Sequence, residues 1–421
     1  MGNIYEGSFL TIAAANAASD STGFLHCTAG RLAYVSKDVK MDGMSNIRVR
    51  PIHDTRVQFS KEPLMTRAWT LQERLLPRRL LSFSSAVTWE CSQDWCECGS
   101  DLFPDPFLGD EKGFNWPSRK RFQEATDKST ITGVTTLPYG YWYSCVMTYM
   151  LRGITRDSDR LPAISAIASK LQRRKSERYL AGLWLDDIAY GMSWHRASAK
   201  DVGPDDIAPV ATSHCSFPSW SWMSCRDPVS FDVHYEFRRS EISVLQAKCN
   251  LSTANEFGMT MDGALVLKGK TVQAQLRSYS LANTSDADWP YDPYIRTYSL
   301  TKPGHDKTSF RNMEDAPLMQ RPCLQCNSEA QGLRKRKCIT VQRATQVLTR
   351  TEYVMEVIDA EVLCLLIGTG RVLGQEARNF LILGRLKHDP PTFQRLGWLL
   401  VRQGDGPEWF EEMQEEVITL C

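Results

Sequence analysis

The residues that could do chemistry together in this chain lie within one short segment, between positions 67 and 73. Arg67, Gln72 and Glu73 supply a guanidinium, an amide and a carboxylate, and Trp69 lies among them. These groups could form a site for a polar ligand. They could equally pair with one another and with the backbone, and so anchor the segment in the fold. Both interpretations remain open from the residues alone.

The segment that carries these groups predicts a short helix followed by a hairpin. Residues 69–76 bring apolar side chains onto one helical face, namely Trp69, Leu71, Leu75 and Leu76. The other face is expected to expose the polar side chains, which are Arg67, Gln72, Glu73 and Arg74. The next residues, 80–83 and 86–89, predict two short strands around a Ser84–Ser85 turn. The polar groups therefore lie at a junction between a helix and a hairpin.

Composition bounds the class of protein. Lys and Arg total 50 and Asp and Glu total 49, so the net charge is +1. The chain therefore lacks the excess of positive charge that is typical of a general nucleic-acid binder. The 421 residues suffice for two or three domains. Residues 1–10 contain no Lys or Arg, and no apolar run reaches membrane-spanning length. We therefore expect a soluble cytoplasmic protein whose 13 cysteines are free thiols.

Conventional catalytic and metal motifs do not occur in the sequence. Two cysteine clusters stand out, Cys91–Cys98 and Cys323–Cys338, but neither supplies four zinc ligands at a standard spacing. No Gly-x-Ser-x-Gly elbow or complete phosphate-binding glycine loop is found. The basic run Arg334–Lys337 is interpreted as a solvated loop, with a nuclear-import or anionic-ligand patch as its alternative. The sequence predicts no metal and no cofactor.

The fold class predicted from periodicity is α+β, in three parts. Residues 1–100 form the first part, in which Phe9–Ala15 has the apolar pattern of a strand inside a parallel sheet. Residues 101–212 comprise a Pro- and Gly-rich linker and a helical segment, with helices over 139–150, 158–171 and 179–194.

The third predicted part, residues 213–421, is β-rich. Residues 217–222 predict a strand with Trp220 and Trp222 on one face, either as plain core or lining a ligand groove. Further strands are expected over 264–267, 361–367, 380–383 and 396–401. Residues 281–343 are expected to form a long flexible insertion, and 409–420 a terminal helix.

Several segments resemble a known fungal family, the heterokaryon-incompatibility (HET) domain. The sequence TRAWTLQERLLPRRLLSF (66–83), followed by WEC (89–91), is similar to the signature that closes this domain. The upstream segment 4–25, IYEGSFLTIAAANAASDSTGFL, is similar to its preceding Tyr-bearing element. The segments 161–172, 179–194 and 217–224 resemble those that follow the domain. The signature residues are Tyr5, Arg67, Trp69, Gln72, Glu73, Trp89 and Cys91.

This resemblance implies a function as well as a fold. It implies a partial α/β HET domain, distantly similar to the TIR fold, in a protein of fungal non-self recognition and programmed cell death. Such a protein would act through a protein partner of an incompatibility system rather than by turnover. Some TIR domains cleave NAD with a glutamate. On that alternative, Glu73 would be the catalytic carboxylate, Arg67 a diphosphate partner and Trp69 a stacking wall.

The resemblance also carries an expectation about the start of the domain. HET domains normally begin with strands and an acidic Trp-Ile-Asp-type segment upstream of the element that contains Tyr5. In this sequence that element begins at once, at Ile4. The resemblance therefore predicts an N-terminally truncated member, with an inactive fragment as a further alternative.

Overall fold

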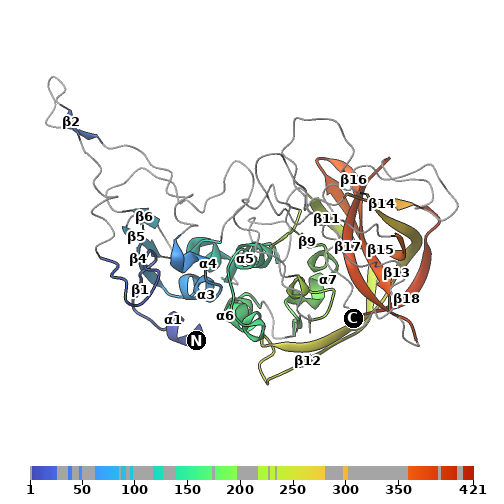
Figure 1. The fold of residues 1–421 in the computed structure, drawn as a ribbon, viewed down its shortest axis with the longest axis horizontal. Helices are drawn as coiled ribbons and strands as arrows, with labels where there is room; N and C mark the ends of the chain where they lie inside the picture. The colour runs from blue at the N-terminus through green and yellow to red at the C-terminus, as the bar shows by residue number, and fades with distance from the viewer. Residues whose placement is uncertain are drawn as a thin grey trace, which may run out of the picture. The chain divides into compact units, whose positions relative to one another are not determined.

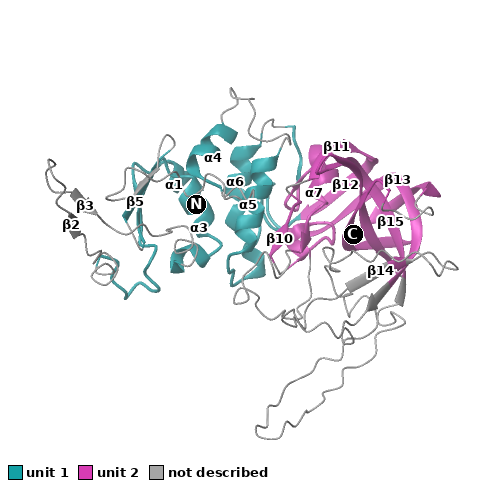
Figure 2. Cartoon of the chain, turned by 90° about the horizontal axis from the view of Figure 1, so that it is seen from above, with its two compact units in different colours: residues 1–179, 251–259 teal, residues 180–250, 260–421 magenta. Residues whose placement is uncertain are grey.

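The computed structural model divides the chain into two compact units. Unit 1 comprises residues 1–179 and 251–259, and unit 2 comprises residues 180–250 and 260–421 (Figure 2). The structure describes residues 2–25, 37–39, 47–49, 62–84, 87–91, 95–97, 117–126, 139–172, 176–196, 217–225, 228–232, 235–279, 297–301, 359–386, 390–404 and 411–421. Both helices and strands are present, as the α+β prediction requires. The residues predicted as a separate helical segment, 139–172, belong to the same unit as residues 2–97.

The described part of unit 1 contains short helices, a four-stranded sheet and a separate two-stranded hairpin (Figure 1). Its helical elements are α1 (Gly2–Glu6), η1 (Pro63–Thr66), α3 (Thr70–Leu75), α4 (Arg119–Thr126), α5 (Gly140–Met150), η2 (Asp157–Asp159) and α6 (Pro162–Leu171). Its sheet has the strand order β1-β4-β5-β6, formed by β1 (Thr11–Ala13), β4 (Arg79–Phe83), β5 (Val87–Cys91) and β6 (Trp95–Glu97). A separate hairpin pairs β2 (Lys37–Val39) with β3 (Ile47–Val49). The predicted helix and hairpin over residues 69–89 are confirmed as α3, β4 and β5.

The prediction for Phe9–Ala15 is wrong in position and burial. Only Thr11–Ala13 forms a strand, and this strand lies at the end of the described sheet, parallel to β4. Phe9 is 82% exposed and Ile12 is 58% exposed. Only the alanines of this segment are buried, at Ala13 and Ala15. An apolar run on both faces thus marks an exposed sheet edge here, because hydropathy alone does not tell a buried strand from an uncovered one.

Helices α5 and α6 form the core of unit 1. The aromatic helix α5 is buried on nearly all sides, and Trp142 is completely enclosed. Trp142 packs edge-on against Tyr179, with ring centroids 5.8 Å apart. Helix α6 begins at Pro162, whose fixed φ suits the first helical turn, and it buries its predicted apolar stripe. The predicted helices over 139–150 and 158–171 are therefore confirmed.

The strands of unit 2 form a closed ring. The long strand β13 (Thr260–Tyr279) pairs with β18 (Gln414–Leu420) through its first half and with β15 (Asp359–Val372) through its second half. Antiparallel pairings then run from β15 to β16 (Gln375–Arg385) and to β17 (Thr392–Arg402), and a short parallel pairing of β17 with β18 completes the circuit (Figure 1). Gly269 permits a close approach, since a Cβ there would lie 2.9 Å from Leu365.

Both faces of these strands are apolar. One face forms a buried cluster of Val272, Ala274, Leu276, Leu300, Val362, Cys364, Leu366, Phe380, Ile382, Leu399 and Val401. The alternate residues Leu365, Ile367 and Leu381 are also buried, as are Leu383 and Trp398. This confirms the strands predicted over 264–267, 361–367, 380–383 and 396–401. Strand β14 (Thr297–Thr301) pairs with β13 inside the segment predicted as a flexible insertion.

The remaining elements of unit 2 lie around the ring. They are β8 (Leu183–Trp184), η3 (Leu185–Asp187), α7 (Ile188–Gly191), β9 (His195–Arg196), η4 (Trp222–Ser224), β10 (Val229–Ser230), β11 (Tyr235–Ser240) and β12 (Ile242–Leu251). Strand β7 (Tyr179–Leu180) pairs with β8. Two predictions are wrong: residues 179–194 contain only a four-residue α-helix, and the predicted terminal helix is strand β18. Ala181 and Gly182, with φ +46° and +94°, form the turn between β7 and β8 that interrupts the predicted helix.

Several predictions lie outside the described residues. These are the linker 101–115, the Cys323–Cys338 cluster, the basic run 334–337 and most of the insertion 281–343. Within the part of the chain that the structure describes, no helix is long and apolar enough to cross a membrane. These described residues include no group of three or more His, Cys, Asp or Glu side chains that could hold a metal ion.

Candidate functional site

The candidate site joins the first helix of unit 1 to helix α3. The hydroxyl of Tyr5, on α1, hydrogen-bonds the carboxyl group of Glu73, on α3. Burial raises the pKa of Glu73, while the Tyr5 hydrogen bond and the charge of Arg67 oppose this shift. Burial also raises the pKa of Tyr5, and the neighbouring Glu73 charge adds to it. The structure therefore assembles a half-buried carboxyl–phenol pair beside a cation.

Helix α1 is held in place by contacts with helix α6. A Cβ on Gly2 would lie 2.7 Å from the Cβ of Ala166, so the glycine permits close packing of the two helices. Glu6 and Lys170 form an ion pair at 2.7 Å. The short helix α1 has no buried residue of its own, and these contacts fix the position of Tyr5 opposite Glu73.

Arg67 precedes α3 in the chain and has an extended backbone conformation. Its backbone forms an isolated parallel bridge with Gly153, and Ala68 N–H donates to the Gly153 carbonyl at 2.9 Å. The Thr70 hydroxyl donates to the Arg67 carbonyl at 2.7 Å and so closes the turn into the helix. The Arg67 side chain is exposed, and it influences Glu73 through charge rather than through a direct ion pair.

The remaining signature residues have different surroundings. Trp69 is half-buried rather than part of the core, and Gln72 is buried rather than exposed, at 1% exposure. Trp89 and Cys91 are half-exposed positions of β5, where they pair with Leu81 and Arg79. Cys91 lies near enough to Arg119 to affect its pKa. The structure therefore groups Cys91 with a second set of polar residues, apart from Tyr5 and Glu73.

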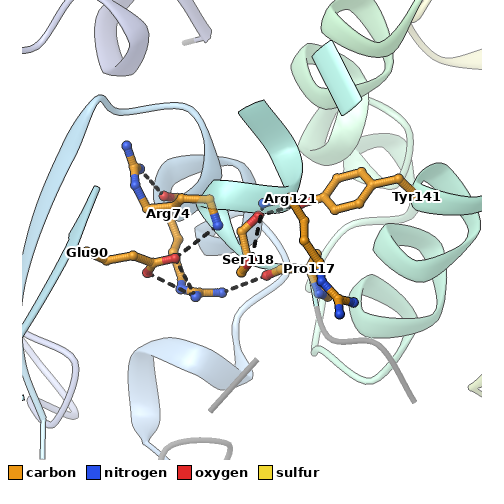
Figure 3. A network of polar contacts seen from close by, with 7 residues as sticks. Arg74, Glu90, Pro117, Ser118, Arg121 and Tyr141 are labelled. Atoms are coloured by element: carbon orange, nitrogen blue, oxygen red, sulfur yellow. Dashed lines mark hydrogen bonds and ion pairs between the residues drawn. The ribbon is translucent and has the colours of Figure 1, made fainter. Parts of the chain in front are cut away.

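This second set is a buried network that the sequence interpretation missed. Arg74, predicted to be exposed, is 4% exposed and binds both carboxylate oxygens of Glu90, at 3.0 and 2.9 Å (Figure 3). Its Nη1 donates to the Pro117 carbonyl, and the Arg119 backbone N–H donates to Glu90 at 3.1 Å. Arg119 Nη1 in turn donates to the Arg74 carbonyl at 2.7 Å. The network ties α3, β5 and α4 together.

The prediction failed for Arg74 because α3 is covered on more than one side. The helix contacts α1, α4 and α6, so an amphipathic pattern with a single apolar face does not describe it. The sequence signal is misleading here, since Glu90 lies just beyond the strand predicted over 86–89 and the apolar residues Val87 and Trp89 favour the opposite face as the inward one, whereas the structure buries Thr88 and Glu90. A carboxylate at an inward-facing position needs a buried cation, and Arg74 is that cation.

Trp220 and Trp222 belong to the core of unit 2. The strand predicted for residues 217–222 is wrong, because Trp222 begins the 3-10 helix η4 after a turn. Both indoles are completely buried. Trp222 Nε1 donates to the Gly182 carbonyl at 2.9 Å, and the Trp220 carbonyl accepts from Trp194 at 3.0 Å. These bonds fix the tryptophans within the packed interior.

Comparison with known proteins bears on the N-terminal region. Residues 1–73 match the family model described as Heterokaryon incompatibility protein (HET). The match includes Tyr5, Arg67, Trp69, Gln72 and Glu73. Neither the curated proteins nor the solved structures gave a match. The HET resemblance of the sequence is therefore confirmed over residues 1–73. This region begins at α1 and ends within α3, the two helices that the Tyr5–Glu73 hydrogen bond joins.

Proposed function

We propose that this protein acts in fungal heterokaryon incompatibility, as an effector of non-self recognition and programmed cell death in the cytoplasm. The HET match over residues 1–73 is the observation that carries this proposal. The Tyr5–Glu73 hydrogen bond supports it, because the bond connects the two ends of the matched region into one local structure. The activity would arise from binding a partner protein.

The exposed residues of the same region support a role in protein interaction. Ile4, Phe9 and Ile12 are 73%, 82% and 58% exposed. Ile4 lies on α1, Ile12 lies on β1, and Phe9 lies between these two elements. Strand β1 is the end strand of the described sheet. Exposed apolar side chains beside the end strand of a sheet are typical of surfaces that bind another chain. A partner that covers this edge would act next to the Tyr5–Glu73 pair.

Expression in a filamentous fungus tests the proposal. Induced expression of the chain should arrest growth, and Ile12→Lys should weaken the arrest because it places a charge on the apolar edge. Leu245→Lys is the matched control, since Leu245 of unit 2 is 56% exposed and lies outside the HET match. Absence of growth arrest, or equal effects of both variants, would contradict the proposal.

The alternative function is a TIR-like NAD-cleaving effector. The half-buried Glu73, with its raised pKa, its Tyr5 hydrogen bond and the charge of Arg67, favours it. A carboxylate in such surroundings can stabilise an oxocarbenium-like centre and hold hydroxyl groups. NAD consumption by the purified chain that disappears in Glu73→Gln but persists in Glu6→Gln would support this alternative. Growth arrest without NAD loss would favour the interaction mechanism.

A further inference from the structure

Helix α1 is docked on unit 1 without burying a side chain. None of its residues is buried, and its apolar residue Ile4 is 73% exposed. A helix of five residues is not stable alone in water, so α1 stays helical only while it is docked. Helix α6, by contrast, buries a continuous apolar stripe. Elements with little buried apolar contact are those that open locally while the rest of a domain remains folded.

The contacts that hold α1 on α3 and α6 are local and polar. At Gly2 the backbone approaches α6 so closely that a Cβ there would lie 2.7 Å from the Cβ of Ala166. The Tyr5 hydroxyl hydrogen-bonds the Glu73 carboxyl group on α3. The ion pair between α1 and α6 lies at the surface, where such pairs contribute little to stability. The docking of α1 therefore depends on one close backbone fit and one hydrogen bond.

The chain that follows α1 is anchored independently of the helix. Strand β1 pairs with β4 through all three of its residues. Gly7 and Ser8 lie between the helix and the strand, and the Gly7 N–H donates to the Asn3 carbonyl at 3.0 Å. Glycine adopts a wide range of backbone conformations, and hinges are a few such residues at the end of an element. Helix α1 can therefore swing away at residues 7–8 while β1 remains paired.

We propose that α1 is a hinged cover over the Glu73 carboxyl group, which opens by local unfolding while α3 and α6 remain folded. Opening separates Tyr5 from Glu73. It also uncovers Ala166 and the neighbouring Leu76, which is 6% exposed in the docked state. The open chain thus presents a carboxyl group beside a small apolar face. This inference goes beyond the HET-type function, because it concerns access to Glu73 whatever binds there.

Carbodiimide coupling of the full chain to glycine ethyl ester, followed by peptide mass mapping, measures the access to each carboxyl group. Gly2→Ala should raise the labelling rate of Glu73 by about 5- to 100-fold, because the added methyl group overpacks the contact with α6. Glu90 is 5% exposed in the same unit, and its labelling should not change while α3 and α6 remain folded. Gly153→Ala is the matched control, since a Cβ there would make an ordinary contact at 3.5 Å and should leave the labelling of Glu73 unchanged.

Hydrogen exchange of the Gly7 and Ser8 amides, which donate to the carbonyls of Asn3 and Tyr5, measures the opening itself. Tyr5→Phe should speed this exchange by about 2- to 10-fold through loss of the hydrogen bond to Glu73, while the amides of α6 keep their rates. Gly2→Ala should speed it as well.

The sign of the Gly2→Ala effect is decisive, because alanine favours a helix over glycine. If α1 were independent of α6, Gly2→Ala would slow the exchange of these amides. Slower or unchanged exchange in Gly2→Ala overturns the proposal. So does labelling of Glu73 that stays unchanged, or that rises only together with labelling of Glu90. Neither measurement needs a partner protein or NAD, so failure here is separate from failure of the proposed function.

Discussion

The two units bury a guanidinium in two different ways. In unit 1, Arg74 lies against the carboxylate of Glu90, which also accepts a backbone N–H from Arg119. In unit 2, Arg395 is completely buried, and its guanidinium lies 3.6 Å from the ring centroid of Trp194. Its nitrogens donate to the backbone carbonyls of Met192 and Trp194. Among the described residues, Arg74 has a carboxylate as its counter-charge, whereas Arg395 meets backbone carbonyl dipoles and an aromatic face.

The two arrangements differ in the pKa shifts of their arginines and in the number of groups that each one binds. Burial moves the pKa of Arg395 well below its ordinary value, and only the Cys225 thiol opposes the shift. Burial lowers the pKa of Arg119 to about 10, and Glu90 opposes that shift. In unit 1 the Glu90 carboxylate binds both the Arg74 guanidinium and the Arg119 backbone N–H. In unit 2 the Trp194 ring contacts the Arg395 guanidinium alone. Loss of Glu90 should therefore affect more of the structure than any change at Arg395.

The largest effect is expected from Glu90→Leu. This change leaves Arg74 buried without its counter-charge and should lower the free energy of unfolding of unit 1 by about 3–5 kcal/mol. Urea denaturation measures the loss. Glu6→Gln is the control, because it breaks only the surface pair with Lys170 and should cost less than about 1 kcal/mol. Equal losses for the two variants would mean that Glu90 does not organise the network.

A smaller effect is expected from Arg395→Lys in unit 2. Lysine keeps the charge but lacks the fork that reaches two carbonyls, so the loss of one charged hydrogen bond should cost about 1.5–3 kcal/mol. Arg402→Lys, at an exposed position of the same strand, should change the stability by about 0.5 kcal/mol or less. If Arg395→Lys cost as much as Glu90→Leu, the contrast between the two units would fail.

The sequence predicted the elements of both units better than it predicted their buried charges. Strands β13, β15, β16 and β17 were found because their residues are continuously apolar, and α5 and α6 because of helical periodicity. The closure of the ring was not predicted, since it depends on pairings such as that of residues 265–271 with β18, far away in the chain. In strand β18 the alternation of apolar and polar residues is too weak to distinguish a strand from an amphipathic helix in the sequence.

The candidate site was predicted in part for the same reason. Tyr5 and Glu73 were singled out through the family resemblance, but their hydrogen bond depends on the packing of α1 against α6. Arg74 and Gln72 were expected on a solvated face because polar residues usually are exposed. Arg119 was overlooked, because a buried cation is recognisable only once its partners are known.

Tryptophan substitutions compare the aromatic surroundings of the two units. Trp69, expected from the sequence to be core, is half-buried, so Trp69→Ala should cost about 1–2 kcal/mol through partial loss of apolar contact. Trp194→Ala removes a completely buried ring together with the aromatic face of Arg395, and should cost at least about 3 kcal/mol. Chemical denaturation followed by the fluorescence of the remaining tryptophans measures both. A loss at Trp69 equal to that at Trp194 would show that Trp69 belongs to the core.

The smallest effect is expected at Glu73, where no full ion pair compensates for burial. Because the pKa of Glu73 is raised in the folded chain, its ionisation costs stability: the favourable contribution is present below the unfolded pKa and is lost as the pH rises through the folded pKa. Glu73→Gln should therefore match the unaltered chain at about pH 4 and exceed it at pH 7, by less than about 1 kcal/mol because the group is partly solvated. Tyr5→Phe removes the hydrogen bond that holds this pKa down, so it should enlarge the pH dependence. Urea denaturation between pH 4 and 7 measures both variants. If Glu73→Gln instead lost stability relative to the unaltered chain as the pH rose, the ionised carboxylate would be stabilising, and Arg67 would then act on Glu73 as strongly as Arg74 acts on Glu90.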